Sequence, residues 1–270
     1  MTNSDEHTPI TTNAPDVSVL VHAVDAQTAW HERIHGVAPI VALDVATLAD
    51  AQALVNELGT SCFFYKVGLE LFAAEGPHVV RWLREQNKNV FVDLKLHDIP
   101  NTVRSAARAI AALGATLLTV HASGGDAMIR AAVEGAAEGN AAGHPCAVLA
   151  VTVLTSLDAH AVNQSWGRTD VSVGPEVVRL ARLALGAGAL GVVCSGQELG
   201  ALKAAFGDDI FTLVPGIRLA GGDAHDQSRV ITPAAAIKAG ADWIVLGRAV
   251  TSAPDRLKAM QAVWAEMRRV

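Results

Sequence analysis

The sequence predicts a (β/α)8 barrel, the TIM-barrel fold, and three observations carry this prediction. Eight short apolar runs recur between residues 39 and 247. Alanine-rich segments with helical spacing lie between several of these runs, and glycine stands near their C-terminal ends. The runs are apolar almost throughout, as expected for strands that are buried on both faces of a parallel sheet and joined by helices.

The predicted elements alternate along the chain. In order, the strands are PIVALD (39–44), CFFYKVG (62–68), NVFVDLK (89–95), TLLTVHA (116–122), AVLAVTV (147–153), LGVVCS (190–195), IFTLVPG (210–216) and WIVLG (243–247). Good helix formers and a closing glycine identify four intervening helices, 46–59, 101–114, 174–188 and 232–240. A doubly wound open sheet is the alternative fold. The first strand is not followed by a GxGxxG motif, which favours the barrel.

We expect two regions in the chain, an N-terminal extension over 1–36 and a single barrel domain over 37–270. Ser, Thr, Asn, Pro and Asp dominate residues 2–17, a composition typical of a mobile segment. Residues 17–36 are compatible with one helix.

Composition excludes several classes of protein. With 270 residues, 51% of them hydrophobic, and a mean hydropathy of +0.30, the chain can bury a substantial core. A net charge of −6 argues against an extended nucleic-acid surface. Crossing a bilayer takes an apolar run of about 18 to 20 residues, which the sequence lacks, and its start is polar and acidic. We therefore expect a cytoplasmic protein that does not enter the membrane.

The three cysteines suggest neither a disulfide framework nor a metal site. Cys62, Cys146 and Cys194 are far apart, odd in number and without CxxC spacing. Buried free cysteine behaves as a small hydrophobe, so we interpret them as reduced core thiols.

Polar residues stand at the C-terminal ends of the predicted strands, which is where TIM barrels carry their active sites. They are Asp44, Lys66, Asp93 with Lys95, His121, Thr155 with Ser156, Ser195, Arg218, and Gly247 with Arg248. The fold predicts that these side chains converge on one mouth. For His121 and the nearby His97, structural hydrogen bonding is the favoured interpretation over catalysis.

The stretch FVDLKLHDIPNT, 91–102, carries the most specific chemistry. Asp93 and Lys95 are two apart on a strand and should share a face, while Asp98 follows in a turn. Two opposite charges about 4 Å apart attract by roughly 4 kcal/mol at an effective dielectric constant near 20, so the carboxylates should hold the lysine as an ammonium. Such a lysine is a proton donor rather than a Schiff-base nucleophile. The pattern is expected of a decarboxylase that needs no organic electron sink.

A second polar group follows the seventh and eighth strands. PGIR (215–218), GGDAHDQSR (221–229) and LGR (246–248) combine glycine-rich turns with arginines. Many TIM barrels bind phosphate at this place through backbone N–H groups and a charged clamp. We predict a phosphate site, with 220–229 as a candidate lid.

Together these motifs resemble the orotidine 5'-phosphate decarboxylase family of the bacterial type. VALDV, KVG, DLKLHDIPNTV, HASGG, VLTSL, PGIR and GR occur in the family's order between about residues 37 and 263. The resemblance implies conversion of orotidine 5'-monophosphate (OMP) to uridine 5'-monophosphate (UMP) and CO2 in de novo pyrimidine biosynthesis, without metal or organic cofactor. It also implies a homodimer.

The resemblance implies a role for each matching residue. Lys95 is similar to the family lysine that protonates C6 of the pyrimidine, and Asp93 to the carboxylate that crowds the departing CO2. Asp98 and Thr102 are similar to residues that reach the neighbouring subunit's site. Lys66 is similar to the residue that joins this charge network and contacts the ribose, so the implied catalytic residues are Lys95, Asp93, Asp98 and Lys66. The remaining implied substrate-binding residues are Asp44 at the ribose, Ile99, Thr155 at the pyrimidine edge, and Arg218, Gln227, Gly247 and Arg248 at the 5'-phosphate.

Two other functions stay open on the sequence alone. One is a sugar-phosphate decarboxylase or aldolase of the same barrel superfamily, with Mg²⁺ held by carboxylates such as Asp93. The other is a non-catalytic nucleotide sensor. The complete set of Asp93, Lys95 and Asp98 argues against a sensor, because a binder gains nothing from crowding charges around an acid.

Overall fold

The structure, a computed structural model, describes residues 38–140, 145–219 and 230–268. All of these residues belong to one compact unit, Ile34–Val270. The predicted extension over 1–36, its possible helix, the candidate lid over 220–229 and Gln227 lie outside the described residues. The proposed boundary at residue 37 therefore stays a prediction.

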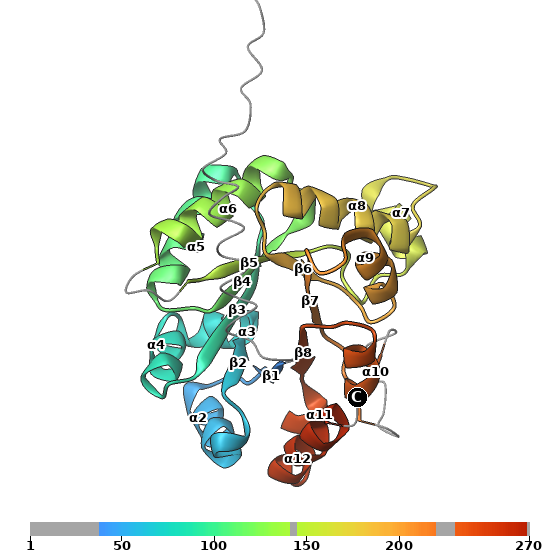
Figure 1. The fold of residues 1–270 in the computed structure, drawn as a ribbon. Coiled ribbons are helices and arrows are strands. Elements are labelled where there is room, and N and C mark those ends of the chain that lie inside the picture. Colours follow the sequence, from blue (N-terminus) through green and yellow to red (C-terminus); the bar gives the residue numbers. More distant parts are fainter. Residues whose placement is uncertain (1–37, 141–144, 220–229, 269–270) are drawn as a thin grey trace, which may run out of the picture. The chain divides into compact units, whose positions relative to one another are not determined.

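Eight parallel strands form a closed barrel in sequence order (Figure 1). They are β1 (Ala38–Leu43), β2 (Phe64–Val67), β3 (Asn89–Leu96), β4 (Leu117–His121), β5 (Ala147–Val151), β6 (Gly191–Val193), β7 (Phe211–Val214) and β8 (Trp243–Leu246). Strands β1 and β8 pair in parallel from Ala38 with Trp243 to Val41 with Leu246, which closes the ring. The predicted TIM barrel is confirmed, every strand end lies within two residues of its predicted position, and the open-sheet alternative is excluded.

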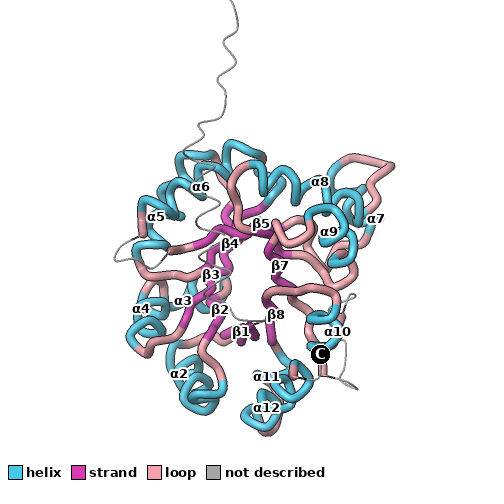
Figure 2. Tube along the Cα trace, in the orientation of Figure 1, coloured by secondary structure: helices cyan, strands magenta, loops and turns pink. Residues whose placement is uncertain are grey.

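Helices surround the ring of strands (Figure 2). They are α2 (Leu48–Leu58), α3 (Leu69–Glu75), α4 (His78–Glu85), α5 (Pro100–Ala112), α6 (Asp126–Glu138), α7 (Ala159–Trp166), α8 (Val173–Gly186), α9 (Leu199–Phe206), α10 (Pro233–Lys238), α11 (Arg248–Thr251) and α12 (Arg256–Met267), with short 3-10 turns at Gly59–Ser61 and Ala122–Gly124. The four predicted helices correspond to α2, α5, α8 and α10. Local capping explains two of their starts: the Thr47 hydroxyl accepts a hydrogen bond from Asp50 N, and Pro100 occupies the first turn of α5.

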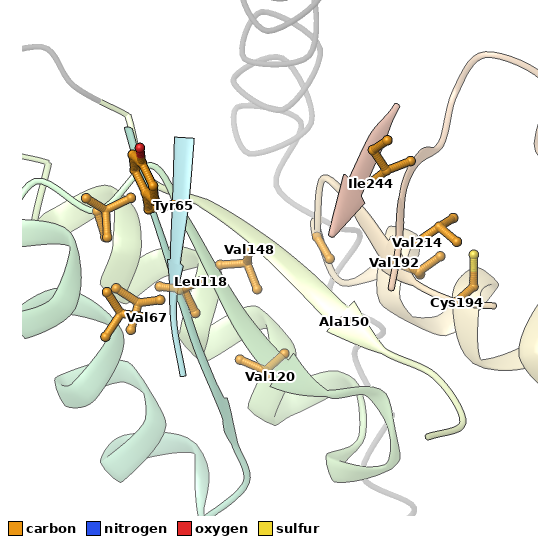
Figure 3. Close-up of a cluster of buried hydrophobic side chains, with 14 of the residues drawn as sticks. Tyr65, Val67, Leu118, Val120, Val148, Ala150, Val192, Cys194, Val214 and Ile244 are labelled. Carbon is orange, nitrogen blue, oxygen red and sulfur yellow. The ribbon is translucent and has the colours of Figure 1, made fainter. Parts of the chain in front are cut away.

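Successive side chains along each strand point alternately toward the helices and into the barrel, so the fold has two packed layers. Side chains facing the helices form one continuous apolar layer, which Figure 3 shows through Tyr65, Val67, Leu118, Val120, Val148, Ala150, Val192, Cys194, Val214 and Ile244. Inward-facing side chains fill the barrel itself. At the start of β7 and β8, the buried rings of Phe211 and Trp243 stack with centroids 5.3 Å apart. The barrel is therefore packed at the amino ends of its strands.

The cysteine prediction is confirmed for the described residues. Cys62, Cys146 and Cys194 are free thiols and all are buried. Burial raises the pKa of the Cys62 thiol and raises that of Cys146 to about 12, so neither is suited to nucleophilic chemistry.

Within the described ranges, none of the helices is long and apolar enough to cross a membrane. The cytoplasmic location expected from the sequence stays a prediction.

Candidate active site

A cavity of about 300 Å³ lies at the carboxyl ends of the strands. Its apolar wall consists of Ala42, Phe91, Val151, Val153, Leu154, Val193, Leu213 and Val245, with Pro215 and Gly216 beside them. Its polar lining residues are Asp44, Lys66, Asp93, Lys95, Thr155, Arg218, Gly247 and Arg248. The barrel thus brings together eight predicted site residues that are up to about 200 positions apart in the chain.

Four charged side chains of alternating sign form one wall. Lys66 Nζ lies 2.8 Å from Asp44 Oδ1 and 3.7 Å from Asp93 Oδ2. Lys95 Nζ donates to both carboxylate oxygens of Asp93, each at 2.9 Å. The Asp93 and Lys66 side chains are only 12% and 11% exposed, so their attraction is screened less than that of a surface pair. Each lysine therefore has a carboxylate partner, and Asp93 sits between both lysines.

The backbone of β3 is irregular where it presents this pair. Its pairing with β4 passes from Val92 opposite Leu118 directly to Leu96 opposite Val120, and Lys95 has a φ of +51°. Non-glycine residues seldom adopt this left-handed conformation. Asp93 and Lys95 point the same way, as the period of a regular strand predicted, but here a bulged strand produces the arrangement.

The buried hydroxyl of Thr119 on β4 supports the bulge. It donates to Asp93 Oδ1 at 2.9 Å and accepts from the backbone N–H of Lys95 at 3.0 Å. Sequence reasoning missed this residue, because a threonine inside a strand reads as an ordinary β-former. The signal available was a threonine in the middle of the run TLLTVHA, between Leu118 and Val120.

Two arginines, Arg218 and Arg248, line the cavity from the loops after β7 and β8, across the closed barrel from β3. Arg218 is 8% exposed; its backbone N–H donates to Ile231 O at 3.0 Å, and its Nη1 donates to Ile217 O at 2.8 Å. Arg248 is exposed and begins α11, directly after Gly247 at the end of β8. These arginines come from the loops after β7 and β8, as the sequence predicted. They make this part of the cavity suited to a dianionic group.

Three predicted site residues lie outside the cavity. Asp98, Ile99 and Thr102 are exposed at the start of α5, and Ile99 is 66% exposed. Asp98 Oδ1 accepts a hydrogen bond from the backbone N–H of Ile99 at 2.6 Å. None of the three lines the cavity of its own chain.

The prediction that all polar strand ends share one mouth was wrong for His121, Ser156 and Ser195, which do not line the cavity. Ser195 is 1% exposed, and its Oγ accepts from the backbone N–H of Gln197 in the turn before α9. His121 faces the ring of His97, with centroids 5.4 Å apart. Desolvation chiefly, with the electrostatic effects of His97 and Lys95, lowers the pKa of His121, and Asp93 opposes this shift.

The described residues contain no cluster of three or more His, Cys, Asp or Glu side chains that could hold a metal ion. Within the charged wall, the two carboxylates already accept hydrogen bonds from lysines. An ammonium group so close would repel a divalent cation.

The chain is similar to known proteins over nearly all of the barrel. Residues 38–263 match the family model described as "Orotidine 5'-phosphate decarboxylase / HUMPS family". Orotidine 5'-phosphate decarboxylase of Anaeromyxobacter sp. (strain K) is 53% identical over 224 residues, which are 82% of this chain and 94% of that protein. The enzyme of that name from Moorella thermoacetica is 48% identical over 233 residues, 86% of this chain and 92% of that protein.

A solved structure agrees with these sequence matches. The crystal structure of orotidine 5'-phosphate decarboxylase from Lactobacillus acidophilus superposes with a TM-score of 0.77 at 39% identity, covering 85% of this chain and 98% of that chain. The resemblance read from the motifs is thereby confirmed. The chain belongs to the orotidine 5'-phosphate decarboxylase / HUMPS family.

Proposed function

We propose that the chain decarboxylates OMP to UMP and CO2 in de novo pyrimidine biosynthesis, without metal or organic cofactor. One observation carries the proposal: a single cavity is lined both by the Asp93–Lys95 ion pair of β3 and by Arg218 and Arg248, which follow β7 and β8 across the closed barrel. The ion pair suits loss of a carboxylate followed by protonation, and the arginines suit a 5'-phosphate. The names of the curated relatives support the same reaction.

Asp93 and Lys95 would divide the chemistry between them. A substrate carboxylate held beside Asp93 meets a like charge, and that repulsion is relieved as CO2 departs. The bond between C6 and the carboxylate carbon breaks, and its electron pair remains on C6. Lys95 Nζ then gives a proton to C6, which forms UMP, and the neutral amine regains a proton from water.

The other residues would bind the nucleotide. Arg218, Arg248 and the backbone N–H of Gly247 would hold the 5'-phosphate, together with Gln227. Asp44 and Lys66 would contact the ribose, and Thr155 the pyrimidine edge. Binding energy gained at the remote phosphate helps to force the substrate carboxylate against Asp93.

We also propose a homodimer in which Asp98, Ile99 and Thr102 complete the neighbouring subunit's site. Their exposure at the start of α5, outside the cavity of their own chain, supports this arrangement. An isoleucine that is 66% exposed is an apolar group that an interface would cover.

A Mg²⁺-dependent sugar-phosphate enzyme is the weaker candidate. It would need Asp93 to face a cation, whereas both oxygens of this carboxylate accept hydrogen bonds from Lys95 at 2.9 Å. A nucleotide sensor is weaker still, because a group of four interacting charges costs desolvation energy without improving the binding of an anionic ligand.

Loss of OMP absorbance, measured with and without EDTA, tests the proposal. We expect equal turnover in both conditions.

Lys95→Ala should abolish turnover and leave UMP binding measurable, because the amine acts on the reacting carbon rather than on the phosphate. The matched control is Lys203→Ala. It removes a lysine of α9 that pairs with Asp242, and neither residue lines the cavity. Chelator-sensitive turnover, or decarboxylation by Lys95→Ala, would refute the proposed mechanism.

A further inference from the structure

Thr119 joins the two halves of the reacting pair. Its Oγ1 lies 2.9 Å from Asp93 Oδ1 and 3.0 Å from the backbone nitrogen of Lys95. We propose that Thr119 is a positioning residue for decarboxylation, which holds the Asp93 carboxylate and the Lys95 backbone in one fixed relation. This inference rests on the function proposed above.

The hydrogen bonds through Thr119 can run in only one direction. The backbone N–H of Lys95 can only donate, so Thr119 Oγ1 accepts there. The single hydroxyl proton is then directed to Asp93 Oδ1, which as a carboxylate oxygen accepts it. The chain from Lys95 N–H through Thr119 to Asp93 is therefore oriented. It helps to fix which way the carboxylate faces while Lys95 Nζ binds the same oxygen at 2.9 Å.

The hydroxyl also replaces a backbone partner that the bulge removes. In a regular parallel ladder, the N–H of Lys95 would donate to a carbonyl of a neighbouring strand. Here the pairing passes from Val92–Leu118 to Leu96–Val120, and the Thr119 hydroxyl supplies the acceptor instead. Lys95 adopts a φ of +51°, which persists only where the surroundings enforce it. Thr119 is one of the groups that enforce it.

Thr119 acts through its neighbours and not on the substrate. Its exposed fraction is 0%, and it does not line the cavity. Removing its hydroxyl should therefore disturb the transition state much more than the binding of the nucleotide. A residue with a merely structural role would change stability and leave kcat unaltered.

The matched pair Thr119→Ser and Thr119→Ala isolates the hydroxyl, because both variants lack the same methyl group. We expect Ser to retain kcat within about threefold of the wild type and Ala to lose roughly tenfold to a hundredfold, the usual effect of losing a hydrogen bond to a charged group. The Kd for UMP, measured by calorimetry, should stay within about threefold in both. If the Ala variant folds poorly, Thr119→Val takes its place, because valine keeps the side-chain volume and lacks the hydroxyl. We expect it to show the same loss of kcat.

Thr212→Ala is the control for losing a buried strand hydroxyl. Thr212 is 0% exposed on β7 and does not line the cavity, and its hydroxyl lies 3.1 Å from Asp242 Oδ2 and 3.3 Å from Gly240 O, either of which can accept its proton. Its variant should lose stability and keep kcat. Equal kcat in the Ser and Ala variants of Thr119, or a loss of UMP binding that matches the loss of kcat, would overturn the positioning role. Failure of the proposed function gives a different result, which is no turnover of OMP by the wild-type chain.

Discussion

Lys66 Nζ donates to Asp44 Oδ1 at 2.8 Å, across the ends of the neighbouring strands β1 and β2. The same nitrogen lies 3.7 Å from Asp93 Oδ2, so Lys66 connects the proposed ribose contact to the proposed reacting pair. Its side chain is 11% exposed, whereas that of Asp44 is 59% exposed. The lysine is thus the buried centre of the network, and Asp44 is its solvent-facing end.

Replacing Lys66 should disrupt the charged wall, because Lys66 interacts with both of its carboxylates. In Lys66→Met, Asp93 loses one of its two cationic neighbours and Asp44 loses its hydrogen bond, and breaking a mostly buried ion pair leaves a poorly compensated charge. We expect kcat/KM to fall by about a hundredfold or more. Steady-state kinetics measures this, with circular dichroism as a check on the fold. Lys203→Met provides the control, since its lysine pairs with Asp242 outside the cavity; a comparable loss there would contradict the assignment.

Arg248→Ala should weaken substrate affinity more than turnover. Arg248 lines the same cavity as the reacting pair, and a charge-assisted contact to phosphate is worth about ten- to a hundredfold in affinity. We expect KM for OMP to rise by that factor, with a smaller change in kcat. Arg256→Ala is the comparison, because Arg256 pairs with Glu57 on the outer helices. An unchanged KM in Arg248→Ala would remove this arginine from the phosphate site.

His121 should make the barrel less stable in mild acid. Desolvation chiefly, with His97 and Lys95, lowers its pKa below the ordinary value of 6.5 that it regains on unfolding. The unfolded chain therefore binds more protons near that pH, so stability is lost as pH falls below about 6.5. Urea unfolding at about pH 7.5 and about pH 5.5 should give a smaller difference in unfolding free energy for His121→Asn than for the wild type. If the two proteins show the same change in unfolding free energy between these pH values, His121 does not contribute to the pH dependence of stability.

The sequence predicted the barrel because its signals are local. Each strand is a short apolar run, and the residue type at the strand end can be read without knowing the neighbours. That reading also located the charged wall, since Asp44, Lys66 and Asp93 end three successive strands whose carboxyl ends must meet.

Contacts between side chains on different strands cannot be predicted from local sequence signals. The bulge in β3 depends on how Lys95 N–H finds the Thr119 hydroxyl on β4, and the two residues are 24 positions apart. Ser195 has the same local pattern as the strand-end residues that line the cavity. The turn after Ser195 keeps its side chain out of the cavity lining. Glu198 Oε2 accepts a hydrogen bond from the Ser195 N–H, and the Ser195 hydroxyl accepts one from the Gln197 N–H. A polar residue at a strand end therefore predicts a position, and the path of the following loop decides whether it faces the cavity.

Subunit mixing tests whether Asp98 acts in the neighbouring site. Lys95→Ala and Asp98→Ala should each be inactive as homodimers. In a hybrid dimer, one site carries both lesions, and the other pairs an intact Lys95 with an intact Asp98 of the partner. Random exchange makes about half of the dimers hybrids, so about a quarter of the wild-type activity should return.

The control for this experiment is a mixture of Lys95→Ala with Lys66→Ala. These two lysines line the same cavity within one chain, so each site of a hybrid keeps one lesion and activity should not return. Native mass spectrometry of an isotope-labelled partner confirms that exchange has occurred. If hybrids form and the mixture of Lys95→Ala with Asp98→Ala stays inactive, Asp98 does not serve the neighbouring subunit. Its exposed carboxylate, which accepts a hydrogen bond from Ile99 N–H at 2.6 Å, would then only cap the turn before α5.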